Sequence, residues 1–285
     1  MAFDDITAVV VAFNSAEILP GCLTAISAAG VSTVVVDNAS TDSTVAIAAN
    51  AGARVLRNAR NEGFGRAMNR GVEVAATKYC LLLNPDVDFA PDAVRILRDA
   101  LESHTNAMLA GPQLIEHDGR DGTLSTSPIN PPVEKSATQT ARFVSLLSGA
   151  ALLLRREAFA ALGGFDPNIF LFWDDNDLCR RAIDAGHDVL RVDAAHIRHA
   201  RGKSGTITPG TIYRSRWHQA WSRFYTFRKY GVASDLQSWI WRFRIKHAFA
   251  RLTNNAARME RYAGSRDGAL AFQRGETALA KEKLI

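Results

Sequence analysis

The sequence contains little cysteine and no long apolar run. Its three cysteines, Cys22, Cys80 and Cys179, are far apart and match neither a disulfide framework nor a zinc spacing, which favours buried thiols in a reducing compartment. No segment reaches the roughly 18 apolar residues of a membrane-spanning helix. The N-terminal MAFDDITAVVVAF has no basic segment before its apolar run, unlike a secretion signal. We therefore expect a cytoplasmic protein.

Several sequence patterns are also absent. There are no internal repeats and no low-complexity segments. With 47% hydrophobic and 22% charged residues, the composition argues against disordered and fibrous classes. No G-x-G-x-x-G follows the first predicted strand, which argues against a dinucleotide-binding dehydrogenase. The segment AFNSAEILPG after that strand also lacks the glycine-rich basic loop that a nucleotidyltransferase would need.

Charge divides the chain into two parts. The 285 residues carry a net charge of +5, but residues 201–285 hold 17 Lys and Arg against 5 Asp and Glu, leaving 17 against 24 for residues 1–200. Such opposite balances indicate different roles. We predict one domain over 1–205, with halves at about 1–115 and 116–205, and a basic C-terminal region over 206–285.

Short β-rich runs alternate with helical patterns through the first half, which is typical of an α/β domain with a mostly parallel sheet. The predicted strands are 7–13, 32–37, 53–57, 79–84 and 107–114, and the run 143–156 returns to the sheet. The predicted helices are 16–29, 42–51, 64–75, 91–103 and 175–184. Residues 116–135 are rich in Gly, Pro, Ser and Asp, and we interpret them as a hairpin and a functional lid.

Acidic residues stand where ligands bind in such sheets, at the carboxyl ends of strands. The apolar run YCLLL leads directly into Asn84, Pro85, Asp86, Val87 and Asp88. An ionised carboxylate is costly to bury unpaired, so this tip must be solvated, paired or facing a cation. A helix N-terminus beginning near Pro91 would also account for it.

A second acidic cluster and a histidine extend the pattern. WDDND places Asp174, Asp175 and Asp177 after an aromatic run, more carboxylates than a helix N-terminus needs. Closely spaced carboxylates raise one another's pKa, which suits a general base. His199 opens HARGKS and is either a structural histidine or a metal ligand. The glycine and serine after it would allow a close approach to phosphate.

Seven motifs in this order resemble an inverting family 2 glycosyltransferase of GT-A fold, closest to the bacterial rhamnosyltransferase and galactofuranosyltransferase branch. They span about residues 6–230 and read VVVAFNSAEIL, VVVDNASTD, NEGFGRAMNRG, LLLNPDV, SGAALLLRREAFAALGGFD, FWDDNDLCRR and HARGKS. The resemblance implies a Rossmann-like, mostly parallel sheet with helices on both faces, followed by a basic, aromatic helical region.

The resemblance also implies a donor site for a nucleotide-diphosphate sugar of the dTDP-rhamnose or UDP-hexose type. Its nucleotide-binding residues would be Ala12, Phe13, Asn14, Asp37, Asn38, Asn61, Gly63, Arg66 and Asn84. Many relatives carry an Asp-x-Asp motif where this chain has Asn84-Pro85-Asp86. That departure leaves Asp86, with His199, as the implied ligands of Mg²⁺ or Mn²⁺, while Asp88 could hold waters.

The implied reaction is a single displacement with inversion, in cell-surface polysaccharide assembly. Asp175 would deprotonate a hydroxyl of a glycan or lipid-linked acceptor, and Asp174 would contact acceptor or donor hydroxyls. Asp177 would orient the helix or pair with an arginine. A nucleotidyltransferase of related α/β fold, or an inactive sugar-nucleotide-binding module, are the alternatives.

The basic residues 213–262 contain four of the five tryptophans. This composition suits the inner surface of an anionic membrane, and equally suits packing against the catalytic domain or in a homo-oligomer. No upstream module for reading bases accompanies it, so we do not expect nucleic acid as a partner.

Overall fold

The computed structural model describes residues 3–116, 118–122, 126–133, 135–138, 140–200 and 210–279. These residues fall into two compact units. Unit 1 comprises Met1–Asp166 and Asp175–Thr206, and unit 2 comprises Pro167–Asp174 and Ile207–Ile285. The sequence-based division between 205 and 206 therefore differs from the structural one in the short segment 167–174, which belongs to unit 2.

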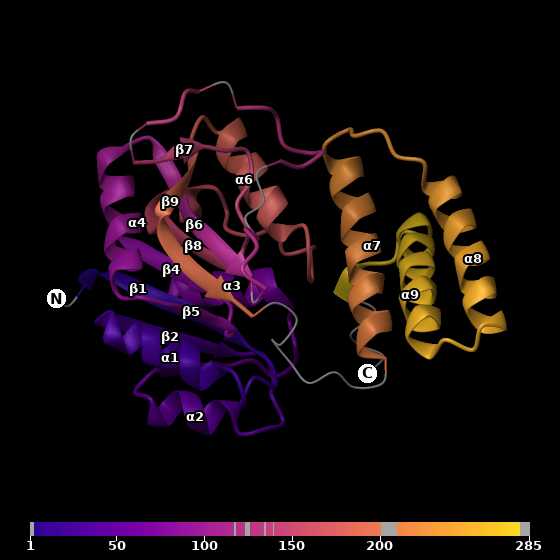
Figure 1. Cartoon of the computed structure of the whole chain (residues 1–285), viewed down its shortest axis with the longest axis horizontal. Helices are drawn as coiled ribbons and strands as arrows, with labels where there is room; N and C mark the ends of the chain where they lie inside the picture. Colours follow the sequence, from indigo (N-terminus) through magenta and orange to yellow (C-terminus); the bar gives the residue numbers. More distant parts are fainter. Residues whose placement is uncertain are drawn as a thin grey trace. The chain divides into compact units, whose positions relative to one another are not determined.

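Within the described residues, unit 1 is built on one nine-stranded sheet. Four of its strands run parallel in the order β3-β2-β1-β4, and Figure 1 labels β2, β1 and β4 of this set. They are β1 (Phe3–Ala12), β2 (Val31–Asp37), β3 (Arg54–Arg57) and β4 (Tyr79–Leu83). Their Val- and Leu-rich sequences suit strands that are covered on both faces.

The remaining strands make the other half of the sheet mixed. They are β5 (Val87–Phe89), β6 (Ala107–Glu116), β7 (Arg142–Phe143), β8 (Ala151–Arg155) and β9 (Asp188–His199). β8 pairs antiparallel with β4 and β6, whereas β6 pairs parallel with β9. β5 joins the sheet through β9, with Val87 opposite His199, so the acidic tip after β4 lies beside the end of β9.

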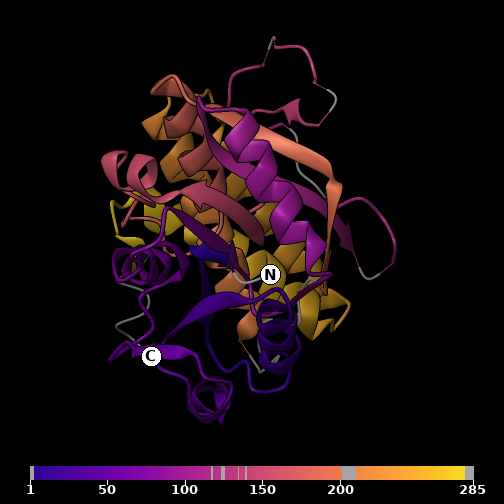
Figure 2. The same ribbon diagram turned by 90° about the vertical axis from the view of Figure 1, so that its left-hand side faces the viewer.

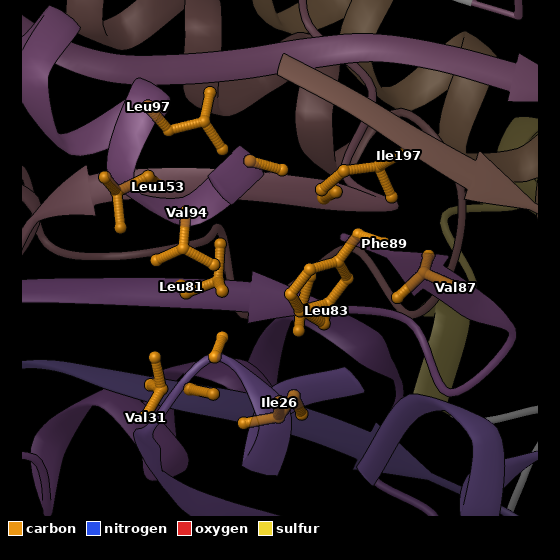
Figure 3. Packing of buried hydrophobic residues seen from close by; sticks show 14 of the residues in the cluster. Ile26, Val31, Leu81, Leu83, Val87, Phe89, Val94, Leu97, Leu153 and Ile197 are labelled. Carbon is orange, nitrogen blue, oxygen red and sulfur yellow. The ribbon is translucent and has the colours of Figure 1, made fainter. Parts of the chain in front are cut away.

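Alternate residues of each strand face opposite sides of the sheet. On one side, Leu81 and Leu83 pack with α1 (Leu19–Ala28) and α4 (Asp92–Ser103), whose Val94 and Leu97 are buried. Figure 3 shows this layer, with Leu153 of β8 and Ile197 of β9 in the same cluster. α4 runs along β6 and β9 (Figure 2). This packing fixes the ends of the strands.

The other side of the sheet is covered by a second set of helices. Met68 of α3 (Phe64–Glu73) and Leu178 of α6 (Asp174–Asp184) pack against Leu82 and Leu152. The remaining helices of unit 1 are α2 (Thr44–Asn50) and α5 (Arg156–Ala161). The predicted α/β fold with helices on both faces and a helical C-terminal region is confirmed.

The predicted lid is described only in part. A turn closed by a bridge between Ile115 and Asp121 stands at its start. Residues 117, 123–125 and 134 lie outside the described residues, as do 201–204 of HARGKS, so the predicted lid and phosphate-approaching glycine stay predictions.

Unit 2 is a helical bundle with an aromatic core. Its helices are α7 (Thr211–Lys229), α8 (Leu236–Leu252) and α9 (Ala256–Gln273). Trp217, Trp221, Phe224 and Phe272 are among its buried side chains. The segment 167–174 packs on α7: the Phe170 ring stacks on the buried His218 ring at 4.4 Å, and the Ser222 hydroxyl donates to the Leu171 carbonyl.

Two glycines let α7 and α9 approach closely. A Cβ atom at Gly264 would collide with the Tyr213 carbonyl oxygen, and one at Gly268 with the Trp217 carbonyl oxygen. The spacing of four residues places both glycines on one side of α9. Glycine at these two positions therefore allows the backbones of α7 and α9 to pack closely.

Candidate active site

Asp37 and Ala12 form the first strand-end cluster. They end β2 and β1 and are register partners in the parallel ladder. The Asp37 carboxylate is completely buried. In the described part of the chain it accepts a shared hydrogen bond from the Ser40 N–H, 3.3 Å from each oxygen, and lies 3.9 Å from the exposed Arg57 Nε. Because a buried carboxylate needs more donors than this, it is suited to accept hydroxyl or N–H groups of a ligand.

The loop after β1 is fastened to the loop after β2. Asn14 adopts a left-handed conformation with φ of 50°, which asparagine tolerates better than most residues. Its backbone N–H donates to the Ser40 hydroxyl at 2.9 Å, and its side-chain oxygen accepts from the Thr41 N–H at 2.9 Å. The half-buried Phe13 lies in the same loop. The structure thus brings the predicted residues Ala12, Phe13 and Asn14 to the edge where Asp37 lies.

Asn38 organises the next part of this edge. Its side-chain N–H donates to the Gly63 carbonyl at 3.1 Å, and its side-chain oxygen accepts from Asn58 at 2.6 Å. Asn61 accepts from the Gly63 N–H at 3.0 Å. Gly63 precedes α3 with φ of 85°, a conformation that favours glycine. Arg66, on the first turn of α3, lies 3.9 Å from the carboxylate of Glu62.

The tip that follows β4 holds Asn84 and Asp86. Asp86 is buried, and its Oδ1 lies 3.3 Å from Nε2 of His199, which ends β9. The Asp86 carbonyl accepts from the Ala200 N–H at 3.0 Å, which holds the two strand ends together. Asp88 is exposed, opposite Arg198. Two residues 113 positions apart that were predicted as metal ligands therefore lie side by side.

The Asp86–His199 pair suits a divalent cation. The His199 Nδ1 atom is buried and has no hydrogen-bond partner within the described residues. A buried ring nitrogen without a partner and a buried carboxylate oxygen at 3.3 Å from the other nitrogen can turn toward a cation that accepts N and O ligands. Among the described residues no group of three His, Cys, Asp or Glu side chains is arranged for a metal.

Asp175 is held by two backbone N–H groups. Gly149 donates to its Oδ2 at 3.0 Å and Asn176 to its Oδ1 at 2.8 Å. Desolvation raises the pKa of this carboxyl above its usual range, although both hydrogen bonds act in the opposite direction. A carboxylate with a raised pKa that keeps a fixed orientation is suited to accept a proton.

Asp175 and the Asp86 tip are joined by the residues that precede β8. The Asn84 N–H donates to the Ala150 carbonyl at 2.9 Å, and the neighbouring Gly149 holds the Asp175 carboxylate. A Cβ atom on Gly149 would lie 3.4 Å from the Cβ of Asp175. Two acidic motifs that are 89 residues apart in sequence are thus connected through the backbone of two consecutive residues, Gly149 and Ala150.

The other two aspartates of WDDND have different environments. Asp177 is completely buried and pairs with Arg181 at 2.8 Å. Arg181 also donates to the Leu162 and Gly164 carbonyls. The prediction that Asp177 pairs with an arginine is confirmed. Asp174 is buried and belongs to unit 2. The residue before it, Trp173, has φ of 66°, which is costly for a bulky side chain.

Sequence reasoning missed two residues of this edge. Gly149 was included in the motif SGAALLL without a role, yet it supplies an N–H to Asp175. Asn58 follows β3 directly, as Asn38 follows β2, and the two amides are hydrogen-bonded. An amide residue after each of two adjacent parallel strands was the signal that could have identified Asn58.

The chain belongs to glycosyl transferase family 2, whose sequence profile matches residues 7–163. It is therefore a glycosyltransferase. An N-acetylglucosaminyl-diphospho-decaprenol L-rhamnosyltransferase of Mycobacterium tuberculosis is 28% identical over 237 residues, covering 68% of this chain and 77% of that protein. An uncharacterized glycosyltransferase of the same species is 42% identical over 86 residues, covering 30% of this chain and 38% of that protein.

Solved structures show the same fold. The mannosyltransferase PcManGT from Pyrobaculum calidifontis, in complex with GDP-Man and Mn²⁺, has a TM-score of 0.59 at 16% identity, covering 98% of this chain and 75% of that one. S. aureus TarS 1-349 in complex with UDP has a TM-score of 0.56 at 15% identity, covering 95% and 92%. GalNAc-T7 with UDP, GalNAc and Mn²⁺ has a TM-score of 0.58 at 16% identity. The match covers 78% of this chain and 49% of that one.

Proposed function

We propose that this glycosyltransferase moves a sugar from a nucleotide-diphosphate donor to a hydroxyl of a glycan or lipid-linked acceptor, with inversion. The observation that carries the proposal is the connection between Asp175 and the Asp86 tip through Gly149 and Ala150. A proton acceptor and a place for the leaving diphosphate must lie on opposite sides of one anomeric carbon. Rigid backbone links between them fix that separation.

The donor would bind along the ends of β1, β2 and β4. The buried Asp37 carboxylate and the loop of Ala12, Phe13 and Asn14 suit the hydroxyls and N–H groups of a nucleoside. Asn38, Asn61, Gly63, Arg66 and Asn84 complete the proposed nucleotide site. The M. tuberculosis relative transfers L-rhamnose to N-acetylglucosaminyl-diphospho-decaprenol, as its name states. We extend that class to this chain: a dTDP-rhamnose or UDP-hexose donor in polysaccharide assembly.

Asp175 would act as the general base. It takes the proton of the acceptor hydroxyl while that oxygen forms its bond to the anomeric carbon. The bond from the anomeric carbon to the donor's phosphate oxygen breaks, and the nucleoside diphosphate leaves with that electron pair. A single attack on one face of the sugar inverts the configuration at the anomeric carbon. General base catalysis accelerates such a step about 10²- to 10⁴-fold. Asp174 is proposed to contact acceptor or donor hydroxyls.

Asp86 and His199 would hold Mg²⁺ or Mn²⁺, with Asn84 and water as further oxygen ligands. The cation, when bound, would neutralise negative charge on the leaving diphosphate. The protein's own contribution is to keep Asp86 buried and oriented through the bond between its carbonyl and Ala200. PcManGT and GalNAc-T7 were solved with Mn²⁺, which supports this assignment.

A lipid-linked acceptor would bring the enzyme to the inner surface of the plasma membrane as a peripheral protein. None of the helices within the described ranges has both the length and the apolarity to cross a bilayer. A homo-oligomer stays a prediction. The nucleotidyltransferase and the inactive binding module are not favoured by the family assignment.

Incubation of the purified protein with a panel of nucleotide sugars tests the proposal. Released nucleoside diphosphate is measured with and without a prenyl-diphosphate-linked N-acetylglucosamine acceptor. We expect one donor to dominate and release to depend on the acceptor. Release of inorganic diphosphate from a nucleoside triphosphate would instead identify a nucleotidyltransferase.

A further inference from the structure

α8 has two apolar sides, and within the described residues it packs through one of them. Trp239 and Ile240 pack in the core of unit 2, where the Trp239 indole N–H donates to the Ser265 carbonyl of α9, and the Phe243 ring lies 4.9 Å from the Trp239 ring. On the other side, Trp241, Ile245, Phe249 and Leu252 are exposed by 61%, 63%, 62% and 84%. Because their spacing is i, i+4, i+8 and i+11, they form one continuous stripe along the helix.

Basic residues border this stripe on both sides. With about 100° of rotation per residue, Arg242 and Lys246 lie along one edge and Arg244 and Arg251 along the other. All four are exposed, and the sequence of α8 contains no Asp or Glu. An apolar stripe between two rows of cations is typical of helices that lie in the interface of an anionic membrane.

A cavity of about 470 Å³ lies between α7 and the first turns of α8 and is lined by Arg223, Arg242, Phe227, Ser238 and Trp239, among others. The Arg223 guanidinium is 4.6 Å from the Phe227 ring and 5.0 Å from the Trp239 ring. Its Nε is buried and makes no hydrogen bond within the described residues.

Two arginines therefore share this cavity. Desolvation and the nearby Arg242 lower the pKa of Arg223. Asp235, the one carboxylate among the described lining residues, accepts from the Ser238 N–H and hydroxyl as the N-cap of α8. The guanidinium pair is suited to an anionic ligand such as phosphate.

We propose that unit 2 docks on an anionic phospholipid surface, with the stripe Trp241-Ile245-Phe249-Leu252 inserted at the headgroup level and a headgroup phosphate bound between Arg223 and Arg242. The use of this surface, to meet a lipid-linked acceptor, rests on the proposed function. Binding to the lipid itself does not.

A second copy of the chain fits the surface less well. Two α8 helices meeting through their stripes would bring rows of arginine and lysine together without any carboxylate from α8 to compensate. Like charges in an apolar contact destabilise it. Anionic headgroups supply the missing negative charge, and each cation near such a surface adds to binding.

Cosedimentation of the full chain with vesicles tests the proposal. Vesicles of phosphatidylcholine alone are compared with vesicles of phosphatidylcholine and phosphatidylglycerol in equal parts, at low and high salt. We expect binding to the anionic vesicles only, weakened by salt. The pair Arg244→Gln and Arg251→Gln should lower the partition coefficient about thirtyfold. The pair Trp241→Ser and Phe249→Ser should lower it at both salt concentrations.

A matched pair, Arg95→Gln and Arg120→Gln, removes the same charge from exposed positions of unit 1 and should leave vesicle binding within about twofold. If this pair weakened binding as much as the α8 pair, attraction would be due to net charge and the docking surface would be wrong. Absence of binding to anionic vesicles, with a dimer lost in Trp241→Ser, would assign the stripe to a second copy and also overturn the proposal.

The phosphate site is tested separately with a short-chain, water-soluble phosphatidic acid and with inorganic phosphate at equal ionic strength. We expect the lipid to bind and both Arg223→Gln and the exposed Arg242→Gln to weaken it about tenfold or more. Binding of inorganic phosphate with equal affinity would show a site for free phosphate rather than a headgroup. Acceptor-dependent release of nucleoside diphosphate, with a short-chain water-soluble acceptor, is measured in the same variants. Loss of vesicle binding with this release intact would separate this proposal from the proposed function.

Discussion

Unit 1 and unit 2 differ in both core and charge. The core of unit 1 is mostly aliphatic, with many Val, Leu and Ala side chains from the strands and helices on both faces of the sheet. The core of unit 2 consists mainly of aromatic rings. The acidic excess belongs to residues 1–200 and the basic excess to residues 201–285. A rigid sheet can hold carboxylates at fixed distances, as a reaction requires, whereas exposed cations need only share one surface.

The largest expected effect is the loss of turnover when an acidic residue of unit 1, Asp175, is replaced. Asp175→Asn should lower turnover by about 10² to 10⁴ while leaving donor binding nearly unchanged, because this carboxylate acts on the acceptor proton. Asp174→Asn should be milder. Steady-state turnover at saturating acceptor and donor titration measure the two effects. Wild-type turnover in Asp175→Asn would remove the base assignment.

The second effect concerns the metal. Chelation should abolish transfer, and Mn²⁺ or Mg²⁺ should restore it. Asp86→Ala should weaken nucleoside diphosphate binding by at least about tenfold, since losses even of outer ligands cost this much, and His199→Ala should weaken it less. Calorimetric titration of the nucleoside diphosphate with and without cation measures this. Full activity after exhaustive chelation would leave Asp86 a structural residue.

The third effect compares the packing of the two units. Gly268→Ala should destabilise the protein by about 1–3 kcal/mol, because the added methyl group meets the Trp217 carbonyl oxygen. Gly21→Ala, in α1 of unit 1, has nothing within 4 Å and should stabilise by up to about 1 kcal/mol. Urea denaturation measures both. Equal effects of the two substitutions would contradict the close α7–α9 contact.

The smallest expected effect is a displacement of the pH profile. Burial raises the pKa of Asp175, so the folded state holds its proton more tightly than the unfolded state. Activity should fall as pH decreases through this raised pKa, above the usual 3.8 of the aspartyl group. Over the same window the contribution of this carboxyl to stability becomes less favourable as pH rises. The acidic limb of kcat/KM measures the pKa, and a limb at or below 3.8 would contradict the prediction.

Much of unit 1 could be predicted because local and global patterns agree there. Strand runs such as VVVD and YCLLL are apolar, short and followed by turn residues, and the structure places β2 and β4 over them. The pairing of Asp86 with His199 was implied only by the family resemblance. It depends on β5 joining β9, a contact between distant segments that no local pattern encodes.

Unit 2 was harder to predict for a physical reason. Its aromatic and basic residues suit both a core and a surface, so composition could not divide them. The structure buries Trp217 and Trp221 and exposes Trp241, which assigns packing to α7 and leaves one side of α8 exposed. The assignment of segment 167–174 to unit 2 could not be predicted either, because nothing in FLFWDD indicates that Phe170 stacks on a ring 48 residues later.

The segment 167–174 has a consequence for cutting the chain. Unit 2 is made from two separate pieces of polypeptide, so the chain passes between the units three times. A single proteolytic cut near residue 206 would not free unit 2 as a soluble fragment, because Phe170, Leu171 and Trp173 would stay covalently attached to unit 1. Such a nicked enzyme should remain assembled, and its two fragments, expressed separately, should reassociate through those side chains.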